Sequence, residues 1–179
     1  MPYHHGDLRR ALLDTALEAI AEHGPVAVSL RDLARRAGVS HAAPTHHFRD
    51  KTGLLTALAA EGWGLLADAL DGVADRKFAE LGVAYVVFAT SHPAHFAVMR
   101  APGLVRRDDP ELQAAERRAG QALQAEPDGS PRDPTTALAG WAMVHGLSAL
   151  LLEGMVTPEP GSDVAELARA VTLRLGQPL

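Results

Sequence analysis

The feature that most constrains this chain is a pair of short helical segments joined by a glycine, within residues 29–51. The apolar residues of the first segment recur at helical spacing on one face: Leu30, Leu33, Ala34 and Ala37. Gly38 follows them, and glycine is the residue that most readily adopts positive φ and reverses the chain. The pattern is typical of a helix-turn-helix, which lays its second helix in the major groove of DNA. The alternative is a small helical hairpin that binds no DNA.

The second segment begins at His41 and carries small and polar side chains, which suit contact with base edges better than burial. Ser29 and Ser40 precede the two segments and are predicted to cap them, with Asp32 completing a capping box. Four residues are expected to face base edges: Arg31, His41, Ala42 and Ala43. Six more are expected to contact phosphate groups: Ser29, Ser40, Thr45, His46, His47 and Lys51. The alternative for Lys51 is a lysine that contacts only water.

The rest of the chain shows helical patterns and no plausible strand. A long helix is predicted from Lys51 to about Gly72, and further helices near residues 75–91, 93–99, 110–125, 135–155 and 163–175. The apolar run 83–88 could form a strand, but its length and Ala-rich flanks favour a buried helix. We therefore predict an all-α protein. A three-helix helix-turn-helix DNA-binding domain occupies residues 1–52, and a helical bundle for ligand binding and dimerisation occupies residues 53–179.

The last two predicted helices carry more apolar surface than one chain needs, which favours a homodimer. The residues expected at its interface are Leu151, Val164, Leu167, Ala168, Val171 and Leu175. Such a pair of helices can dock on a two-fold copy as a four-helix bundle. One short reading helix makes few base contacts, whereas two copies would read half-sites about 34–36 Å apart. The alternative is a monomer in which these helices cover only their own core.

Aromatic and other soft side chains are concentrated in the middle of the chain and around Trp141. The residues predicted to line an apolar cavity are Trp63, Tyr85, Phe88, His92, Phe96, Met99, Trp141 and His145. An apolar cavity with a few polar groups is the usual character of a small-molecule site. The alternative is that these side chains fill the core, in which case the His145 imidazole needs a protein partner.

Metal binding and catalysis are not expected. His92, His95 and His145 are possible ligands, but no carboxylate or thiolate lies near them in the sequence, so we expect no metal and no cofactor. Gly146–Leu150 lacks the second glycine of a nucleophile elbow. No pair of catalytic carboxylates or glycine-rich phosphate loop is recognisable either, so we expect a protein that is not an enzyme.

Composition is consistent with a folded cytoplasmic protein. The 179 residues are 47% hydrophobic and include no cysteine, which fits a reducing compartment. No run approaches 18 uncharged apolar residues and no signal peptide is recognisable, so we expect no membrane partner. The net charge is −5, while residues 1–51 alone carry seven Lys/Arg and six Asp/Glu. DNA binding by such a chain would depend on geometry more than on bulk positive charge.

The segment from His5 to about Leu58 resembles the DNA-binding domain of TetR/AcrR-type repressors. The resemblance is carried by Leu12-Leu13, Ala16, Gly24, Ala34, Ala37-Gly38-Val39-Ser40, Phe48, Lys51 and Leu54-Leu55. Further along, residues 92–99 and the run Trp-Ala-Met-Val-His-Gly at 141–146 resemble a subgroup with a Trp-x-x-x-His-Gly signature. The resemblance implies dimerisation through the last helices. The family usually has a phosphate-contacting tyrosine at the position of Thr45, whose side chain reaches less far.

These observations predict a ligand-responsive transcriptional regulator. It would be a repressor that binds a palindromic operator in double-stranded DNA as a homodimer and is released by a small-molecule effector. Two alternatives stay open. One is a constitutive DNA-binding protein with no effector, and the other is a helical small-molecule-binding protein or enzyme with a vestigial DNA module.

Overall fold

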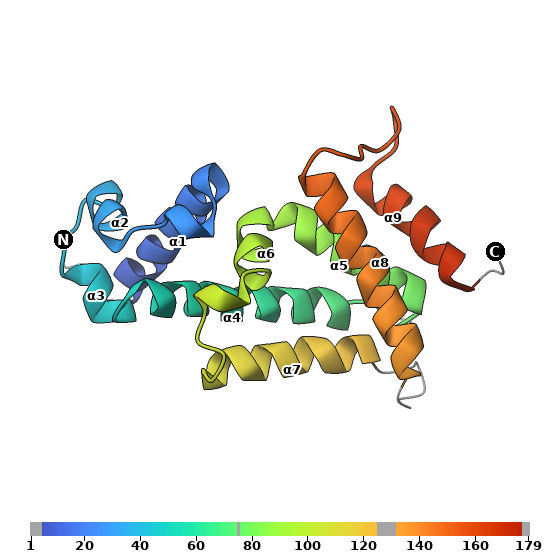
Figure 1. Cartoon of the computed structure of the whole chain (residues 1–179), viewed down its shortest axis with the longest axis horizontal. Coiled ribbons are helices and arrows are strands. Elements are labelled where there is room, and N and C mark those ends of the chain that lie inside the picture. Colours follow the sequence, from blue (N-terminus) through green and yellow to red (C-terminus); the bar gives the residue numbers. More distant parts are fainter. Residues whose placement is uncertain (1–4, 75, 125–131, 177–179) are drawn as a thin grey trace. The chain divides into compact units, whose positions relative to one another are not determined.

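The computed structural model describes residues 5–74, 76–124 and 132–176, with side chains described only between residues 8 and 174. Within these ranges all regular structure is helical, which confirms the predicted fold class (Figure 1). The chain forms two compact units. The N-terminal unit is Met1–Gly62 with Pro93–Ala114, and the C-terminal unit is Trp63–His92 with Ala115–Leu179. The functional division at residue 52 stays a prediction, because residues 53–62 and 93–114 belong to the N-terminal unit by their contacts.

The N-terminal unit is built around its first helix. Its elements are α1 (His5–His23), η1 (Pro25–Ala27), α2 (Leu30–Arg36), α3 (Ala43–Phe48), the first half of α4 (Lys51–Asp71), α6 (Pro93–Met99) and η2 (Pro102–Leu104). Helix α1 packs against α2, α3 and α6. The fully buried side chains at its centre include Leu12, Leu13, Leu33, Leu54 and Leu58. Burial of these leucines holds the short helices α2 and α3 against the longer helices α1 and α4.

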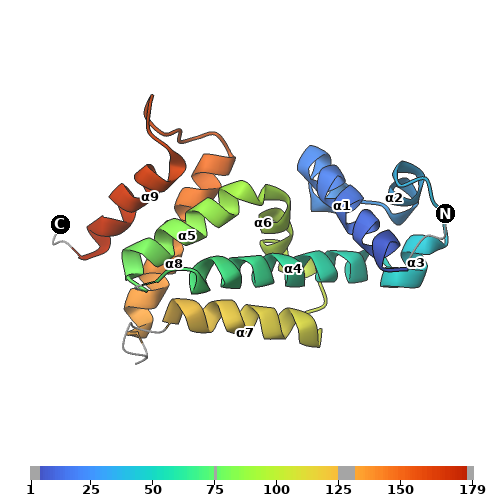
Figure 2. The ribbon, with the colours of Figure 1, turned by 180° about the vertical axis from the view of Figure 1, so that it is seen from behind.

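The C-terminal unit is organised around α5 (Phe78–Ser91). Its other elements are the second half of α4, most of α7 (Pro110–Gln124), α8 (Pro134–Leu152), α9 (Val164–Thr172) and η3 (Leu173–Gly176). Helix α5 packs against both α8 and α9, which lie side by side (Figure 2). Residues 83–88 lie within α5 and are mostly buried, so the run is a buried helix as predicted. The predicted helix ends at residues 75 and 125 lie outside the described residues.

Gly82 allows the three helices of this unit to approach closely. A Cβ atom at this position would lie 2.6 Å from Cγ2 of Thr172 on α9 and 3.1 Å from Cγ1 of Val144 on α8. Both neighbours are β-branched and therefore stiff at χ1. They are also buried, so neither can turn into solvent. The absence of a side chain at Gly82 thus sets how closely α5 meets α8 and α9.

Two helices are more apolar than the sequence analysis allowed. By length and composition alone, α4 and α8 could cross a membrane, and α5 with α6 could form a third span if counted as one broken helix. Half of the apolar stretch of α4 is buried in the protein, whereas only 22% of that of α8 is. The expectation that no stretch reaches this limit was therefore wrong, because α8 has no charged residue over its 19 positions. Most of the apolar surface of α8 is therefore not covered by the rest of this chain.

We predict opposite stability effects for alanine at two helical glycines. Gly82→Ala should lower the free energy of unfolding by about 1–3 kcal/mol, because its Cβ overpacks the junction with Thr172 and Val144. Gly64→Ala should raise it by about 0.5–1 kcal/mol, because no atom lies within 4 Å of the added Cβ and alanine favours the helix. Urea unfolding of the two variants measures both effects. A Gly82→Ala protein as stable as Gly64→Ala would contradict the close crossing.

Candidate nucleic-acid interface and apolar pocket

The turn of the helix-turn-helix closes through backbone hydrogen bonds. Gly38 has φ 66°, as predicted from its position. The amide of Val39 donates to the carbonyl of Ala34 at 2.9 Å, and the amide of Gly38 donates to Arg35 at 3.3 Å. These two bonds form a Schellman motif, which satisfies carbonyls at the end of α2. The turn therefore fixes the chain direction into α3 without help from side chains.

The helix starts differ from the prediction. Ser29 occupies the N-cap position of α2, but its side chain makes no capping hydrogen bond. Helix α3 begins at Ala43 with Ala42 as its N-cap, so Ser40 does not cap it either. Asp32 takes part in no capping box, because its carboxylate accepts hydrogen bonds from the guanidinium groups of Arg35 and Arg36. Both predicted caps were thus wrong.

The ion pairs on α2 involve two of its three arginines. Hydrogen bonds from Arg35 and then Arg36 hold the pKa of the Asp32 carboxyl below its usual value. Arg36 also donates to the Glu22 carboxylate at 2.9 Å. Arg31 is exposed and makes no hydrogen bond or ion pair with the described residues. Of the three arginines on α2, Arg31 is therefore the one whose charge is not already neutralised.

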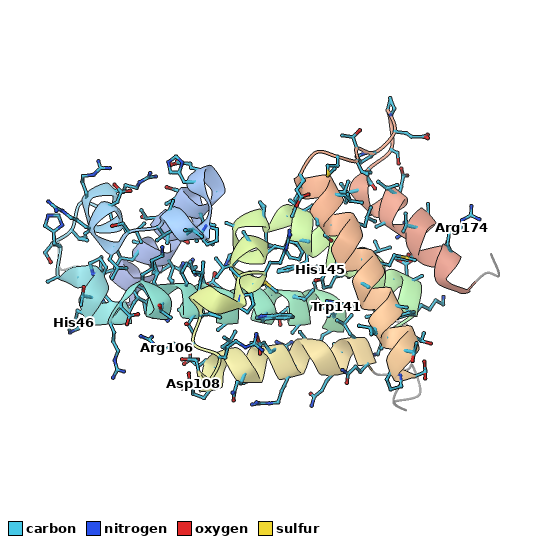
Figure 3. All side chains as sticks on the ribbon, viewed as in Figure 1. His46, Arg106, Asp108, Trp141, His145 and Arg174 are labelled. Atoms are coloured by element: carbon cyan, nitrogen blue, oxygen red, sulfur yellow. The ribbon has the colours of Figure 1, made fainter. Side chains whose placement is uncertain are left out.

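Three of the predicted DNA-contacting residues, Ser29, Arg31 and His41, line one hollow. A shallow hollow of about 400 Å³ is lined by Ser29, Arg31, Asp32, Arg35 and His41. Ala42, Thr45 and His46 are exposed along α3 and the turn before it, and Figure 3 shows His46 on α3 in the N-terminal unit. Ser40 is exposed as well, whereas Ala43 and His47 are half-buried. The exposed polar groups of these residues are hydroxyls, imidazoles and a guanidinium group.

Lys51 is positioned by the protein itself. Its ammonium donates a hydrogen bond to the backbone carbonyl of Val26, 25 residues earlier in the chain. This bond ties the start of α4 to η1. An ammonium group has two further donors, so a phosphate contact by Lys51 remains a prediction.

The C-terminal unit contains an apolar pocket of about 530 Å³. The second half of α4, α7, α8 and the residues just before α8 supply its walls: Trp63, Glu116, Gly120, Leu123, Gln124, Arg132, Pro134, Ala137, Leu138 and Trp141. Trp63 and Trp141 are the two tryptophans of the chain. The polar groups are few, and one of them, Arg132, is 7% exposed with its guanidinium 4.0 Å from the centre of the Phe78 ring.

The predicted ligand-contacting residues are only partly brought together. Trp63 and Trp141 line the pocket. His145 lies one turn further along α8 (Figure 3), and its Nδ1 is 2.9 Å from the hydroxyl of Tyr85. This contact supplies the protein partner that the imidazole needs. The other predicted residues fall in two places. The rings of Phe88 and His92 lie with their centres 5.3 Å apart in the C-terminal unit, whereas Phe96 and Met99 belong to the N-terminal unit.

The sequence analysis missed most of the pocket lining. Glu116, Gly120, Leu123 and Gln124 lie on α7, for which the sequence predicted a helix but no part in a pocket. Gly120 was a possible signal. A glycine inside a helix lowers the stability of that helix relative to alanine, so its presence can mark a place where a side chain would fill needed space. A Cβ at Gly120 would meet no atom within 4 Å.

The histidines form no metal centre in the described part of the chain. No group of three or more His, Asp or Glu side chains there could hold an ion. His95 is 5% exposed, and its Nε2 lies 3.1 Å from the carboxylate of Glu61. Glu61 also accepts from Arg10 at 2.7 Å, so this carboxylate joins α1, α4 and α6. His95 has a structural partner within the N-terminal unit.

The predicted dimer residues differ in how much surface they leave uncovered. Leu151, Val164, Leu167 and Val171 are half-buried in the single chain. Ala168 is 0% exposed because α9 packs on α5, so it has no surface left for a second copy and we remove it from the interface. The side chain of Leu175 lies outside the described residues.

Comparison with known families identifies the class of protein. Residues 12–58 match the bacterial regulatory proteins of the tetR family, and residues 78–175 match the tetracyclin repressor-like C-terminal domain. The second match alone covers more than half of the chain. This chain belongs to the TetR family and is a DNA-binding transcriptional regulator with a helix-turn-helix.

One curated relative and two solved structures show how far the similarity extends along the chain. The HTH-type transcriptional regulator BetI of Escherichia coli O139:H28 is 47% identical over 62 residues, which cover 35% of this chain and 32% of BetI. A protein of unknown function from Rhodococcus sp. RHA1 is 36% identical, with a TM-score of 0.75 over 98% of this chain and 96% of that one. The multidrug binding protein EbrR, crystallised with imidazole, is 26% identical with a TM-score of 0.62, over 98% and 93% of the two chains.

Replacing the free arginine of α2 should weaken DNA binding without weakening the fold. Arg31→Ala should lower about 10-fold the affinity for a duplex that the wild-type protein binds, because one charge-assisted contact to a base or phosphate is lost. Arg36→Ala is the matched control, because that guanidinium is used by Asp32 and Glu22. It should change affinity less than Arg31→Ala does. Gel-shift titrations measure both, and equal losses would contradict the assignment of Arg31.

Proposed function

We propose that this TetR-family regulator is a cytoplasmic homodimeric repressor that leaves a palindromic operator when a small molecule fills the C-terminal pocket. The observation that carries the proposal is the pocket of about 530 Å³ with both tryptophans in its wall. Its volume falls within the range of about 300–1,000 Å³ of small-molecule sites. A constitutive regulator with a filled core would not need this space. EbrR, described as a multidrug binding protein, supports the same function by similarity.

The pocket favours a flat, largely apolar effector. Indole faces at Trp63 and Trp141 offer stacking surfaces, and Leu123 and Leu138 add aliphatic walls. Glu116 and Arg132 line the same pocket, so its wall includes one negative and one positive side chain.

Helix α4 connects the pocket to the helix-turn-helix, so it can pass a change at the pocket on to α3. Its first half, from Lys51 to Gly62, belongs to the N-terminal unit, and its second half carries Trp63 at the pocket. An effector that displaces Trp63 therefore acts on the same helix that follows the reading helix α3. The effector must bind the two arrangements with different affinities for release to occur. A 100-fold loss of operator affinity corresponds to about 2.7 kcal/mol of coupling.

The uncovered face of α8 supports the homodimer. Ala139 and Ala142 are exposed, and Gly146 and Ala149 follow at helical spacing and are half-buried. Small residues at this spacing let a second helix approach closely. The larger exposed apolar side chains nearby include Leu138, Leu150, Leu152 and Met155. A second copy would cover the surface that makes α8 apolar enough to resemble a membrane span.

Filling the pocket should abolish the effector response. Gly120→Leu places a side chain into open space in the pocket wall, so the fold and operator binding should be preserved. Both tryptophans line the pocket, so intrinsic fluorescence reports its occupancy directly. In a screen of aromatic compounds, those that release the operator should change the fluorescence of the wild type and leave Gly120→Leu unaffected. Gly64→Leu, outside the pocket wall, is the control, and release that persists in Gly120→Leu would place the effector elsewhere.

A charge at the centre of the small-residue face should separate the dimer. Ala142→Glu should give a monomer in analytical ultracentrifugation, because the glutamate would be buried against its own copy. Operator affinity should fall by about 100-fold, since the two half-sites are no longer bound together. Ala114→Glu makes the same change at an exposed position of α7 and should leave the dimer intact. A dimeric Ala142→Glu protein would place the interface away from this face.

A further inference from the structure

Arg49 joins α3 to α4 in a backbone conformation that residues with a side chain rarely adopt. Its φ and ψ are 67° and −54°. The amide of Asp50 donates to the carbonyl of Phe48 at 2.9 Å, which closes a three-residue γ-turn around Arg49. A γ-turn with positive φ is rare and strained, whereas glycine adopts positive φ freely. The chain thus keeps an arginine where glycine would fit with less strain.

The Arg49 side chain makes no polar contact within the described part of the fold. It is exposed and forms no hydrogen bond, ion pair or ring contact with any described residue. The neighbouring carboxylate of Asp50 is taken by Arg106, whose Nη2 lies 2.6 Å from Oδ2. A strained position whose side chain serves no internal contact points to an external one.

The hollow next to Arg49 is lined by several basic side chains and by two carboxylates. Arg49 lines a hollow of about 320 Å³ together with Arg9, His47 and Arg106. The guanidinium of Arg9 lies 5.4 Å from the centre of the Phe48 ring and makes no ion pair with a described residue. The carboxylates of Asp109 and Glu111 line the same hollow. These carboxylates lower the positive potential of the hollow, so an anion would have to contact the guanidinium groups of Arg9 and Arg49 directly.

We propose that Arg49, with Arg9 beside it, binds a backbone phosphate of the DNA next to the bases read by α3. The proposal rests on the proposed operator binding of this regulator. Arg49 directly follows the last residue of α3 and is exposed, as are Thr45 and His46 on that helix. The phosphate contact explains why arginine is retained in the γ-turn. Such a contact adds affinity for every duplex and does not select a base.

Glycine at this position separates backbone strain from charge. Arg49→Gly should raise the melting temperature by about 2–4 °C, because the γ-turn is relieved. It should also weaken binding about 10-fold, both to a duplex that the protein selects from a random pool and to an unselected duplex. The slope of log affinity against log salt concentration should fall by about one. Arg49→Gln keeps the strain and removes the charge, so it should lose the same affinity at unchanged stability.

Arg76→Gly is the matched control. Arg76 is the other arginine with positive φ, at 47°, and its side chain donates to the carbonyl of Ala122 in the C-terminal unit. This variant should leave DNA affinity and the salt slope unchanged. Wild-type affinity and salt slope in both Arg49→Gly and Arg49→Gln would overturn the phosphate contact, even though the wild type binds DNA. A wild-type protein that binds no duplex would overturn operator binding itself, and the phosphate contact with it.

Discussion

The close junction between α3 and α4 is the constraint on which the reading surface depends. Only Arg49 and Asp50 separate the two helices, so α3 has no linker in which to move. A Cβ at Gly53 would lie 2.0 Å from the carbonyl oxygen of Phe48, which shows how tightly the first turn of α4 is set against the end of α3. The Asp50 carboxylate accepts the amide of Gly53 at 2.8 Å and thereby caps α4. The first turn of α4 and the end of α3 are thus packed as one piece.

The same junction is braced from the α6–α7 connection. The backbone amide of Arg106 donates to the hydroxyl of Thr56 at 2.9 Å, while its guanidinium pairs with Asp50. Residues 93–114 consequently belong to the N-terminal unit, although the chain reaches them only after passing through α5. The start of α4 is thus held from two distant parts of the sequence. This explains why a boundary drawn after the helix-turn-helix does not coincide with the compact unit.

Local signals in the sequence were sufficient for the all-α fold and for the glycine turn. Gly38 could be placed because positive φ and a Schellman bond are properties of a few adjacent residues. The caps at Ser29 and Ser40 could not, because Asp32 found partners in Arg35 and Arg36 and the start of α3 moved to Ala43. Which hydrogen bonds form at a helix start depends on competition among nearby side chains, and residue spacing alone does not show which bond forms.

The pocket was harder to predict because it depends on contacts between distant segments. Trp63 and Trp141 were identified by type, since large aromatic side chains often line small-molecule sites. The contribution of α7 was hidden, because Glu116 and Gln124 look like surface residues until α4 and α8 are placed beside them. Phe96 and Met99 were misleading for the opposite reason. They are apolar and close to His92 in sequence, but α6 uses them to pack the N-terminal unit, where a Cβ at Gly62 would lie 2.8 Å from the Met99 sulfur.

In a protein of net charge −5, charge pairing determines which cations of the N-terminal unit are left without a carboxylate partner. Most arginines near the reading surface are neutralised by an adjacent carboxylate: Arg10, Arg35, Arg36 and Arg106. Arg9, Arg31 and Arg49 have no such partner among the described residues. A few unpaired cations at fixed positions give weak attraction to DNA in general but strong contacts where the phosphates match them. The internal ion pairs therefore leave less positive charge free for sequence-independent attraction to a duplex.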